Sequence, residues 1–313
     1  MAKKPPPQKR RPAPAKTPAR GGRPTGLFTW LAVGLVVVIV VALVVIKIAS
    51  SSPSADGSSK NFQPTDPTTF AELTTVPASV FNTVGVTSPV AEVTPPQYIA
   101  HQPALTTTDE DGKTVPEVLF IGAEYCPYCA AQRWTTIIAL SRFGTWGGLG
   151  NMSSYSQDVY PNTPSFTFIH ATYKSKYLVF KSVEEYTNYV DPATNYYAPL
   201  QSPTAAEAAI FKKYDSPKYI HGLTAALAES IPFISYANKY FVVGASYSPA
   251  TLSGSTRSEI AAGLSNATSP ITEAIIASAN YQTAVVCSLT NGQPTNVCTS
   301  PGVLTAAKAM DMK

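Results

Sequence analysis

The chain has 313 residues, of which 44% are hydrophobic and 13% are charged, so it is long enough to bury the core of one large domain. Its net charge of +4 is unevenly distributed. Residues 1–26 carry eight Lys or Arg and no acidic residue, which leaves 15 Lys or Arg against 19 Asp or Glu in the remainder. The remainder is therefore mildly acidic, and this argues against a general basic face of the kind that binds nucleic acid.

The N-terminal region predicts a membrane anchor. Residues 1–26 are Pro-rich and basic, and we expect a disordered cytoplasmic tail. Residues 27–46, LFTWLAVGLVVVIVVALVVI, contain no charge. A helix of this length spans a hydrocarbon core of about 30 Å, and the run exceeds the roughly 7–15 apolar residues of a cleavable signal peptide. Because basic flanks stay in the cytoplasm, we expect a single-pass anchor with the rest of the chain outside the cell membrane.

The rest of the chain divides into a linker and a domain. Residues 47–67 are rich in Ser, Pro and Gly, which indicates a flexible linker, and residues 68–313 form the extracytoplasmic domain. All four cysteines lie in this domain. An even number of cysteines outside the cytoplasm favours disulfide chemistry.

The predicted elements of the domain mix strands and helices. Pro77 divides residues 68–85 into two short helices, and Asp111-Gly112 marks the turn of a hairpin. A buried strand over residues 118–121 leads to the first cysteine, and apolar spacing predicts a helix from there to Gly144. The later elements are strands within 165–180, helices over 203–214 and 223–229, strands over 233–236 and 240–245, and helices over 257–264 and 271–281.

Two cysteines lie in FIGAEYCPYCAAQR, where the buried strand gives way to the helix. Cys126 precedes Pro127, which suits the first position of a helix. The unpaired N–H groups and the positive dipole of a helix N-terminus stabilise a thiolate, and lower a cysteine pKa from about 8.5 to about 3.5–7.5. Cys129 follows one turn later, within disulfide reach. The pattern predicts Cys126 as the exposed nucleophile and Cys129 as the buried resolving cysteine.

Two other interpretations of this pair are weaker. A metal site needs further ligands, and His101, His170 and His221 show no ligand spacing, so we expect no metal. An inert disulfide between Cys126 and Cys129 would close a very short loop and stabilise the fold little.

The second cysteine pair, Cys287 and Cys298, flanks the turn-rich segment SLTNGQPTNV. A bridge there would close a loop of about a dozen residues and contribute on the order of 3 kcal/mol. We expect a structural disulfide. The alternative is a second redox pair that relays electrons to the first.

The motif AEYCPYC resembles the signature of the thioredoxin superfamily, and its Pro-Tyr dipeptide is similar to that of glutaredoxins. The resemblance implies a cis-proline opposite the cysteines at the head of a hairpin. Ile231-Pro232, followed by FISYANKYFVVG, matches that element, and its backbone would pair with a substrate strand. Thioredoxins also carry a buried acid six residues before the first cysteine. Phe120 occupies that position here, so proton transfer from Cys129 must use water or another group.

Three neighbours of the pair are candidate modulators: Glu124, Tyr128 and Arg133. Glu124 matches the Glu of the superfamily signature, but acidic residues are usually exposed and we expect it in solvent. Arg133 lies one turn beyond Cys129. Two interpretations of its side chain are left: an electrostatic effect on the cysteine pair, or a place on the solvent-exposed face of the helix.

Over residues 68–313 the sequence is similar to a narrower family, domain-of-unknown-function family 929 of actinobacteria and archaea. GAEYCPYCAAQRW, PNTPSFTF, IPFISYANKY and AVVCSLTNGQP carry the resemblance. It implies an α/β, thioredoxin-like fold with a helical insertion at about 182–230, preceded by the transmembrane helix. Some members of the family are labelled thiol–disulfide isomerases.

These observations predict a membrane-anchored thiol–disulfide oxidoreductase that acts as an oxidase or isomerase. Its partners would be exported cysteine-containing proteins and a membrane redox partner that renews the cysteine pair, with no bound cofactor and no nucleic acid. The alternative is a non-enzymatic surface module that keeps the thioredoxin scaffold and binds proteins through its insertion.

Overall fold

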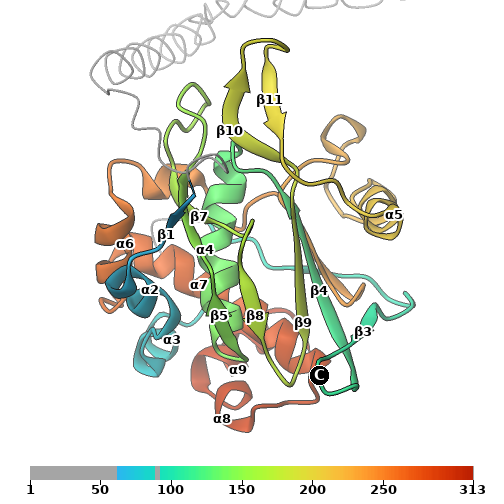
Figure 1. Cartoon of the computed structure of the whole chain (residues 1–313). Coiled ribbons are helices and arrows are strands. Elements are labelled where there is room, and N and C mark those ends of the chain that lie inside the picture. The colour runs from blue at the N-terminus through green and yellow to red at the C-terminus, as the bar shows by residue number, and fades with distance from the viewer. Residues whose placement is uncertain (1–61, 89–91, 313) are drawn as a thin grey trace, which may run out of the picture. The chain divides into compact units, whose positions relative to one another are not determined.

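The computed structural model of the chain describes residues 62–88 and 92–312 (Figure 1). The predicted tail and membrane anchor, residues 1–26 and 27–46, lie outside these residues. No helix within the described ranges is both long and apolar enough to cross a membrane.

The described residues form a mixed α/β structure. Its strands are β1 (Gln63–Pro64), β2 (Gln97–Tyr98), β3 (Thr106–Thr108), β4 (Thr114–Gly122), β5 (Thr145–Gly147), β6 (Gly150–Ser153), β7 (Pro164–Thr167), β8 (Thr172–Lys174), β9 (Val179–Glu184), β10 (Tyr186–Asp191), β11 (Tyr196–Pro199), β12 (Phe233–Tyr236) and β13 (Tyr240–Val243). Its helices are α2 (Pro67–Thr74), α3 (Ala78–Val84), α4 (Pro127–Ser141), α5 (Ala205–Tyr214), α6 (Arg257–Gly263), α7 (Pro270–Leu289), α8 (Thr295–Cys298) and α9 (Pro301–Ala309), with short 3-10 turns at η2 (Ala225–Leu227) and η3 (Pro249–Leu252).

A central sheet positions the first cysteine pair. β4 pairs with β12 antiparallel and with β9 parallel, while β13 extends the sheet beyond β12. The last residues of β4 lie opposite Phe233 of β12 and Glu184 of β9. The ends of three segments that are distant in sequence therefore meet just before Cys126.

The sheet is covered on both faces, which explains the uninterrupted apolar run in β4. Val118 and Phe120 belong to the larger core, shared with α4 and α7. Leu119 and Ile121 alternate onto the other face and pack in a smaller core with residues of α5. Figure 1 shows α5 on the opposite side of the sheet from α4.

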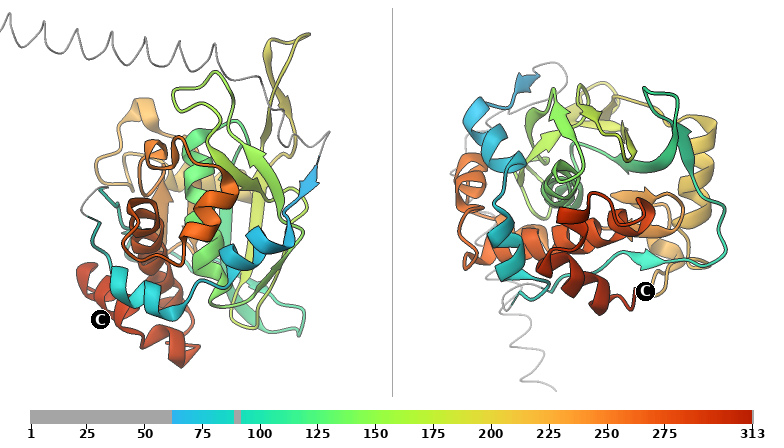
Figure 2. Two further views of the ribbon diagram at one scale, coloured as in Figure 1. Left: turned by 90° about the vertical axis from the view of Figure 1, so that its left-hand side faces the viewer. Right: turned by 90° about the horizontal axis from the view of Figure 1, so that it is seen from below.

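α4 is the central helix of the domain, and almost every one of its residues is buried. It packs against α7 on one side and β7 on another, and Figure 2 shows it enclosed between the C-terminal helices and the strands. Trp134 is fully buried, and its indole N–H donates to the Pro164 carbonyl at 2.9 Å. The helix that carries Cys129 is thus rigidly held.

Two boundaries differ from the sequence prediction. Residues 62–67, assigned to the linker, belong to the folded unit, because β1 pairs with β6 and Asp66 caps α2 by accepting from the Thr69 N–H at 2.9 Å. The insertion at 182–230 is not mainly helical. Its first residues complete β9, and β10 and β11 form an antiparallel hairpin, leaving α5 and η2 as its helical parts. The content of Tyr, Thr and Val in residues 186–199 favours strands over helix.

Candidate active site

Cys126 occupies the N-cap position of α4, immediately after the turn that follows β4. Its Sγ accepts a hydrogen bond from the Cys129 backbone N–H at 3.3 Å. Both residues are free thiols, with Cys126 5% exposed and Cys129 fully buried. Gly122 makes room for the Cys129 sulfur beside β4, since a Cβ at this position would lie 2.7 Å from the Phe120 ring and 3.1 Å from the Cys129 Sγ. The expectation of an exposed Cys126 is therefore wrong, although Cys126 is less deeply buried than Cys129, which is buried as expected.

The surroundings separate the acidities of the two thiols. Burial opposes ionisation of Cys126, but hydrogen bonds from Cys129 and the positive charge of Arg133 outweigh it and lower the Cys126 pKa. Burial, together with the hydrogen bond to Cys126 and its negative charge, raises the pKa of Cys129 well above the usual value. When the pair loses its first proton, the negative charge therefore resides on Cys126.

A second segment completes the surroundings of the Cys126 sulfur. The Ile231–Pro232 peptide bond is cis, in agreement with the sequence expectation. The Cys126 thiol donates to the Ile231 carbonyl at 3.6 Å, and β12 begins directly after Pro232. The predicted substrate-binding pair thus lies against the predicted nucleophile, although 105 residues separate Cys126 from Ile231 in the chain.

A buried ion pair lies beneath the cysteines. Arg133 is fully buried, so the solvated helix face considered for it is wrong. Its Nε donates to Glu184 Oε1 at 2.9 Å, and its Nη2 donates to Glu184 Oε2 at 2.5 Å and to the Ala123 carbonyl at 2.9 Å. Because the carbonyl belongs to the turn before Cys126, the guanidinium ties β9, α4 and the cysteine motif together.

Glu124 is also buried, which corrects the expectation of a solvated side chain. Neither carboxylate oxygen makes a hydrogen bond of good geometry, although the Thr167 hydroxyl and the Asn188 N–H lie near it. Burial, followed by repulsion from Glu184, raises the pKa of Glu124 to about 7, against smaller opposing effects that include Arg133. Glu124 thus exchanges its proton near neutral pH, two residues from Cys126.

Comparison with known proteins places the chain in a family. The sequence profile of the family described as "Domain of unknown function (DUF929)" matches residues 105–288, more than half of the chain. The chain belongs to the DUF929 family. The matched region contains Cys126, Cys129, Ile231, Pro232 and the Arg133–Glu184 pair. Searches of curated proteins and of solved structures found no match to the chain.

Tyrosines of the DUF929 chain also surround Cys126. Of these, the sequence indicated only Tyr128 as a site residue. Tyr128 is 40% exposed and packs edge-on against Tyr160 at 5.8 Å between ring centroids. Tyr125 stacks on Tyr197 of β11, with centroids 3.9 Å apart and planes 3° apart. The density of Tyr in residues 186–197 is the sequence signal, but nothing in it reveals that the hairpin folds back to the cysteine motif.

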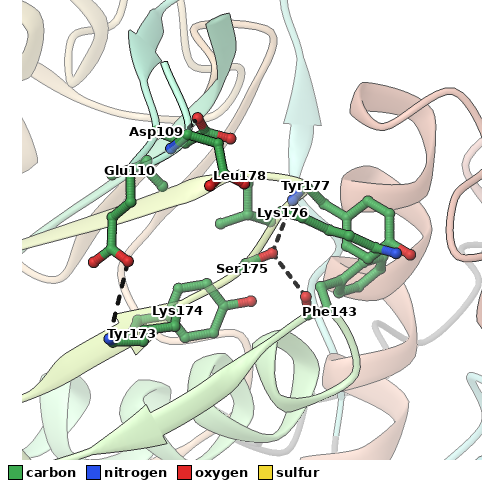
Figure 3. A pocket seen from close by; sticks show the side chains of 11 residues that line it. Asp109, Glu110, Phe143, Tyr173, Lys174, Ser175, Lys176, Tyr177 and Leu178 are labelled. Carbon is green, nitrogen blue, oxygen red and sulfur yellow. Dashed lines mark hydrogen bonds and ion pairs between the residues drawn. The ribbon is translucent and has the colours of Figure 1, made fainter. Parts of the chain in front are cut away.

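Other candidate features of the DUF929 chain lie away from this site. Cys287 and Cys298 form the expected disulfide. A pocket of about 400 Å³ opens at the far end of β4, lined by the β3–β4 turn and the β8–β9 connection, where Glu110 and Lys174 form an exposed ion pair (Figure 3). No group of three His, Cys, Asp or Glu that could hold a metal ion occurs among the residues that the structure describes.

Proposed function

We propose that the DUF929 chain is a membrane-anchored, extracytoplasmic thiol–disulfide oxidoreductase with a thioredoxin-like fold, acting as an oxidase or isomerase of exported proteins. One observation carries this proposal. The Cys126 sulfur, at the start of a buried helix, accepts from the Cys129 N–H and contacts the Ile231 carbonyl beside Pro232. A purely structural cysteine has no need of this arrangement.

The order of the elements supports the finer assignment of the fold. The elements follow one another in the order that the resemblance to thioredoxins implies: β4, the cysteine motif, α4, the parallel strand β9, the hairpin β12–β13 that Pro232 precedes, and α7. The β10–β11 hairpin and α5 interrupt this order between β9 and β12.

The proposed chemistry is reversible thiol–disulfide exchange. In the reducing direction the Cys126 thiolate attacks a client disulfide, forming a mixed disulfide and releasing one client sulfur as a thiolate. Cys129 then loses its proton and attacks the Cys126 sulfur, which releases the second client thiolate. Two electrons pass to the client, and a disulfide remains between Cys126 and Cys129. Oxidation of a client dithiol is the same sequence in reverse.

Buried charges assist both steps. Arg133, fixed by Glu184, favours the anionic sulfur of Cys126. Cys129 must be deprotonated to attack, and Phe120 offers no group for this. Glu124 and Cys129 both lie close enough to Arg133 for their charges to act on it, and the Glu124 pKa of about 7 suits proton exchange at neutral pH. We assign Glu124 the role of proton acceptor for this step, directly or through water.

The cellular setting is part of the same proposal. The uncharged segment 27–46 would hold the domain at the outer face of the membrane, where exported proteins acquire disulfides. In this position a membrane redox partner can accept the two electrons left on the pair after client oxidation, or supply them after client reduction.

A trapping experiment tests the proposal. Full-length Cys129→Ser protein, purified in mild detergent, is mixed with a small secreted protein carrying scrambled disulfides and analysed by non-reducing electrophoresis. We expect a covalent adduct through Cys126 that a reductant removes, because the resolving thiol is missing. Cys126→Ser protein should form none. If Cys129→Ser protein traps no client and wild-type protein rearranges no disulfide, the non-enzymatic binding module replaces the oxidoreductase.

A further inference from the structure

Aromatic rings gather around Cys126 in two groups, one of five tyrosines joined by ring contacts and one formed by Tyr128 and Tyr160. Seven of the 17 tyrosines of the chain belong to it, and we call them the tyrosine surface: Tyr125, Tyr128, Tyr155, Tyr160, Tyr186, Tyr196 and Tyr197. They come from three segments: the cysteine motif, the β6–β7 connection and the β10–β11 hairpin. This convergence of distant segments beside one sulfur requires a functional explanation.

Tyr197 is the centre of the tyrosine surface. Its ring stacks on Tyr125, meets Tyr155 at 5.2 Å and meets Tyr196 at 5.7 Å between centroids. The outer members project into solvent, with Tyr196 54% and Tyr128 40% exposed. Inner rings are thus fixed by stacking, while the outer rings remain available for contact.

The tyrosine surface is continuous with the reacting sulfur. Tyr125 and Tyr128 flank Cys126 in sequence, and the Glu124 N–H donates to the Tyr186 carbonyl at 2.9 Å, which fixes the base of the hairpin at the cysteine motif. Figure 1 shows the β10–β11 hairpin projecting beyond the sheet at the end where α4 begins. A chain bound beside Cys126 would therefore run along the hairpin.

The charges of this region are of one sign. Residues 155–162 and 185–199 contain Asp158, Glu185 and Asp191 but no Lys or Arg. Asp158 lies close enough to Tyr128 and Tyr197 for its charge to contribute to their raised pKa values, after the larger effect of burial. The cationic group beneath the site, Arg133, is fully buried and paired with Glu184. An approaching substrate therefore meets aromatic rings and carboxylates.

We propose that the tyrosine surface docks an extended polypeptide segment with aromatic or basic side chains beside its cysteine, and that it discriminates against the anionic tripeptide glutathione. This inference rests on the proposed function and names its substrate class. Tyrosine rings offer large contact areas at low entropic cost and attract Lys and Arg over their faces. The neighbouring carboxylates add attraction for basic segments and repel the carboxylates of glutathione.

Exchange kinetics with matched disulfides test this inference. Reduced full-length protein in detergent is mixed with four probes: glutathione disulfide, a symmetric hexapeptide disulfide with Phe and Arg beside the cysteine, its Phe-and-Glu counterpart, and neutral hydroxyethyl disulfide. Oxidation of Cys126–Cys129 is followed in stopped flow. We expect the Arg peptide to react about tenfold faster than the Glu peptide and glutathione disulfide, with the difference shrinking at high salt.

Variants of the tyrosine surface separate docking from chemistry. Tyr160→Ser with Tyr196→Ser should slow the reaction with the Arg peptide about five- to tenfold, and Asp158→Asn should reduce the rate ratio of the Arg peptide to the Glu peptide about threefold. The rate with hydroxyethyl disulfide should stay unchanged. Tyr98→Ser, an exposed tyrosine at the other end of the sheet, and Asp111→Asn, in the β3–β4 turn, serve as controls and should leave all rates unchanged.

The outcomes distinguish two failures. Equal rates for both peptides and glutathione disulfide, or a surface variant that slows hydroxyethyl disulfide as much as the Arg peptide, would overturn the docking inference and leave the oxidoreductase intact. A wild-type protein that reacts with none of the four probes would overturn the proposed function itself.

Discussion

The two cysteine pairs occupy opposite ends of helices. Cys126 caps the N-terminus of α4 and stands three residues from Cys129, and both are thiols. Cys287 lies in the last turn of α7 and is bonded to Cys298 of α8, eleven residues away, with Cα atoms 5.5 Å apart. A helix N-terminus favours an anionic sulfur, whereas the C-terminus disfavours it.

The comparison shows how position assigns the role of a cysteine. Around Cys126 the protein adds a buried cation, a titratable carboxyl and a second segment at Ile231. Around Cys287 it adds a disulfide partner that joins α8 to the end of α7, and the Gly292 N–H donates to the Cys287 carbonyl at 2.8 Å. The second pair is a cross-link, whereas the surroundings of the first pair fit the exchange that we propose.

Removal of the Cys126 sulfur, set against removal of both sulfurs of the second pair, is the strongest way to break the comparison. Cys126→Ser should lower disulfide exchange by at least about 10³-fold, because the nucleophile is lost. Cys287→Ala with Cys298→Ala should retain exchange within about twofold. Turnover of a peptide disulfide measures both variants. Loss of turnover in the Cys287/Cys298 variant would make the second pair a redox relay.

Arg133→Met should have the largest effect on stability. It leaves Glu184 buried without its partner, and we expect a loss of about 3–5 kcal/mol in the free energy of unfolding. It should also raise the pKa of Cys126, since the cation near the sulfur is gone. Urea unfolding and thiol alkylation measure the two effects.

A double variant separates these effects. Arg133→Met with Glu184→Gln removes the unpaired charge and should recover most of the stability, while the Cys126 pKa stays raised. Recovery of both properties together would show that Arg133 acts on Cys126 only through the fold.

Removal of the Cys287–Cys298 bridge should lower stability by about 3 kcal/mol on a chain-entropy argument for a loop of this length. Replacement of both residues by Ala leaves the rest of α7 and α8 in place. Denaturant unfolding of the oxidised proteins measures the change. A loss below about 1 kcal/mol would contradict a structural role for this disulfide.

Glu124→Gln should change the pH dependence of stability. The folded-state pKa of about 7 lies above the ordinary value of 4.5, so the protonated carboxyl favours the folded state, and its contribution is lost as pH rises from about 4.5 through 7. The side chain of the variant stays neutral. Its free energy of unfolding should exceed that of the wild type by on the order of 2–3 kcal/mol at pH 8, and by less at pH 5.

The control for this pH profile is Glu110→Gln, an exposed carboxyl at the far end of β4. It should leave the profile unchanged. A parallel shift of the Glu124→Gln stability at all pH values would contradict a carboxyl that titrates near 7.

Local signals in the sequence account for most of the fold. Pro77 divides α2 from α3, Asp111-Gly112 lies in the turn between β3 and β4, and the apolar run of β4 forms the predicted buried strand. The β10–β11 hairpin escaped prediction because its strands pair mainly with each other and carry tyrosines and polar residues in place of a regular apolar alternation.

Without the resemblance, the site was predictable only where its residues are close in sequence. Cys126 and Cys129 follow from spacing, and Ile231-Pro232 from resemblance. Glu184 was missed because its partner Arg133 lies 51 residues away and no local pattern links them. The burial of Glu124 was not predicted because acidic residues are usually exposed, whereas this side chain is fully buried.

Alkylation of the reduced full-length protein across pH tests the central claim most directly. With a mass-resolved iodoacetamide probe, we predict that Cys126 titrates below the ordinary thiol pKa of about 8.5, while Cys129 stays unreactive until far higher pH. Two thiols that both titrate at or above 8.5 would contradict the account, because no stabilised thiolate would then exist at the start of α4.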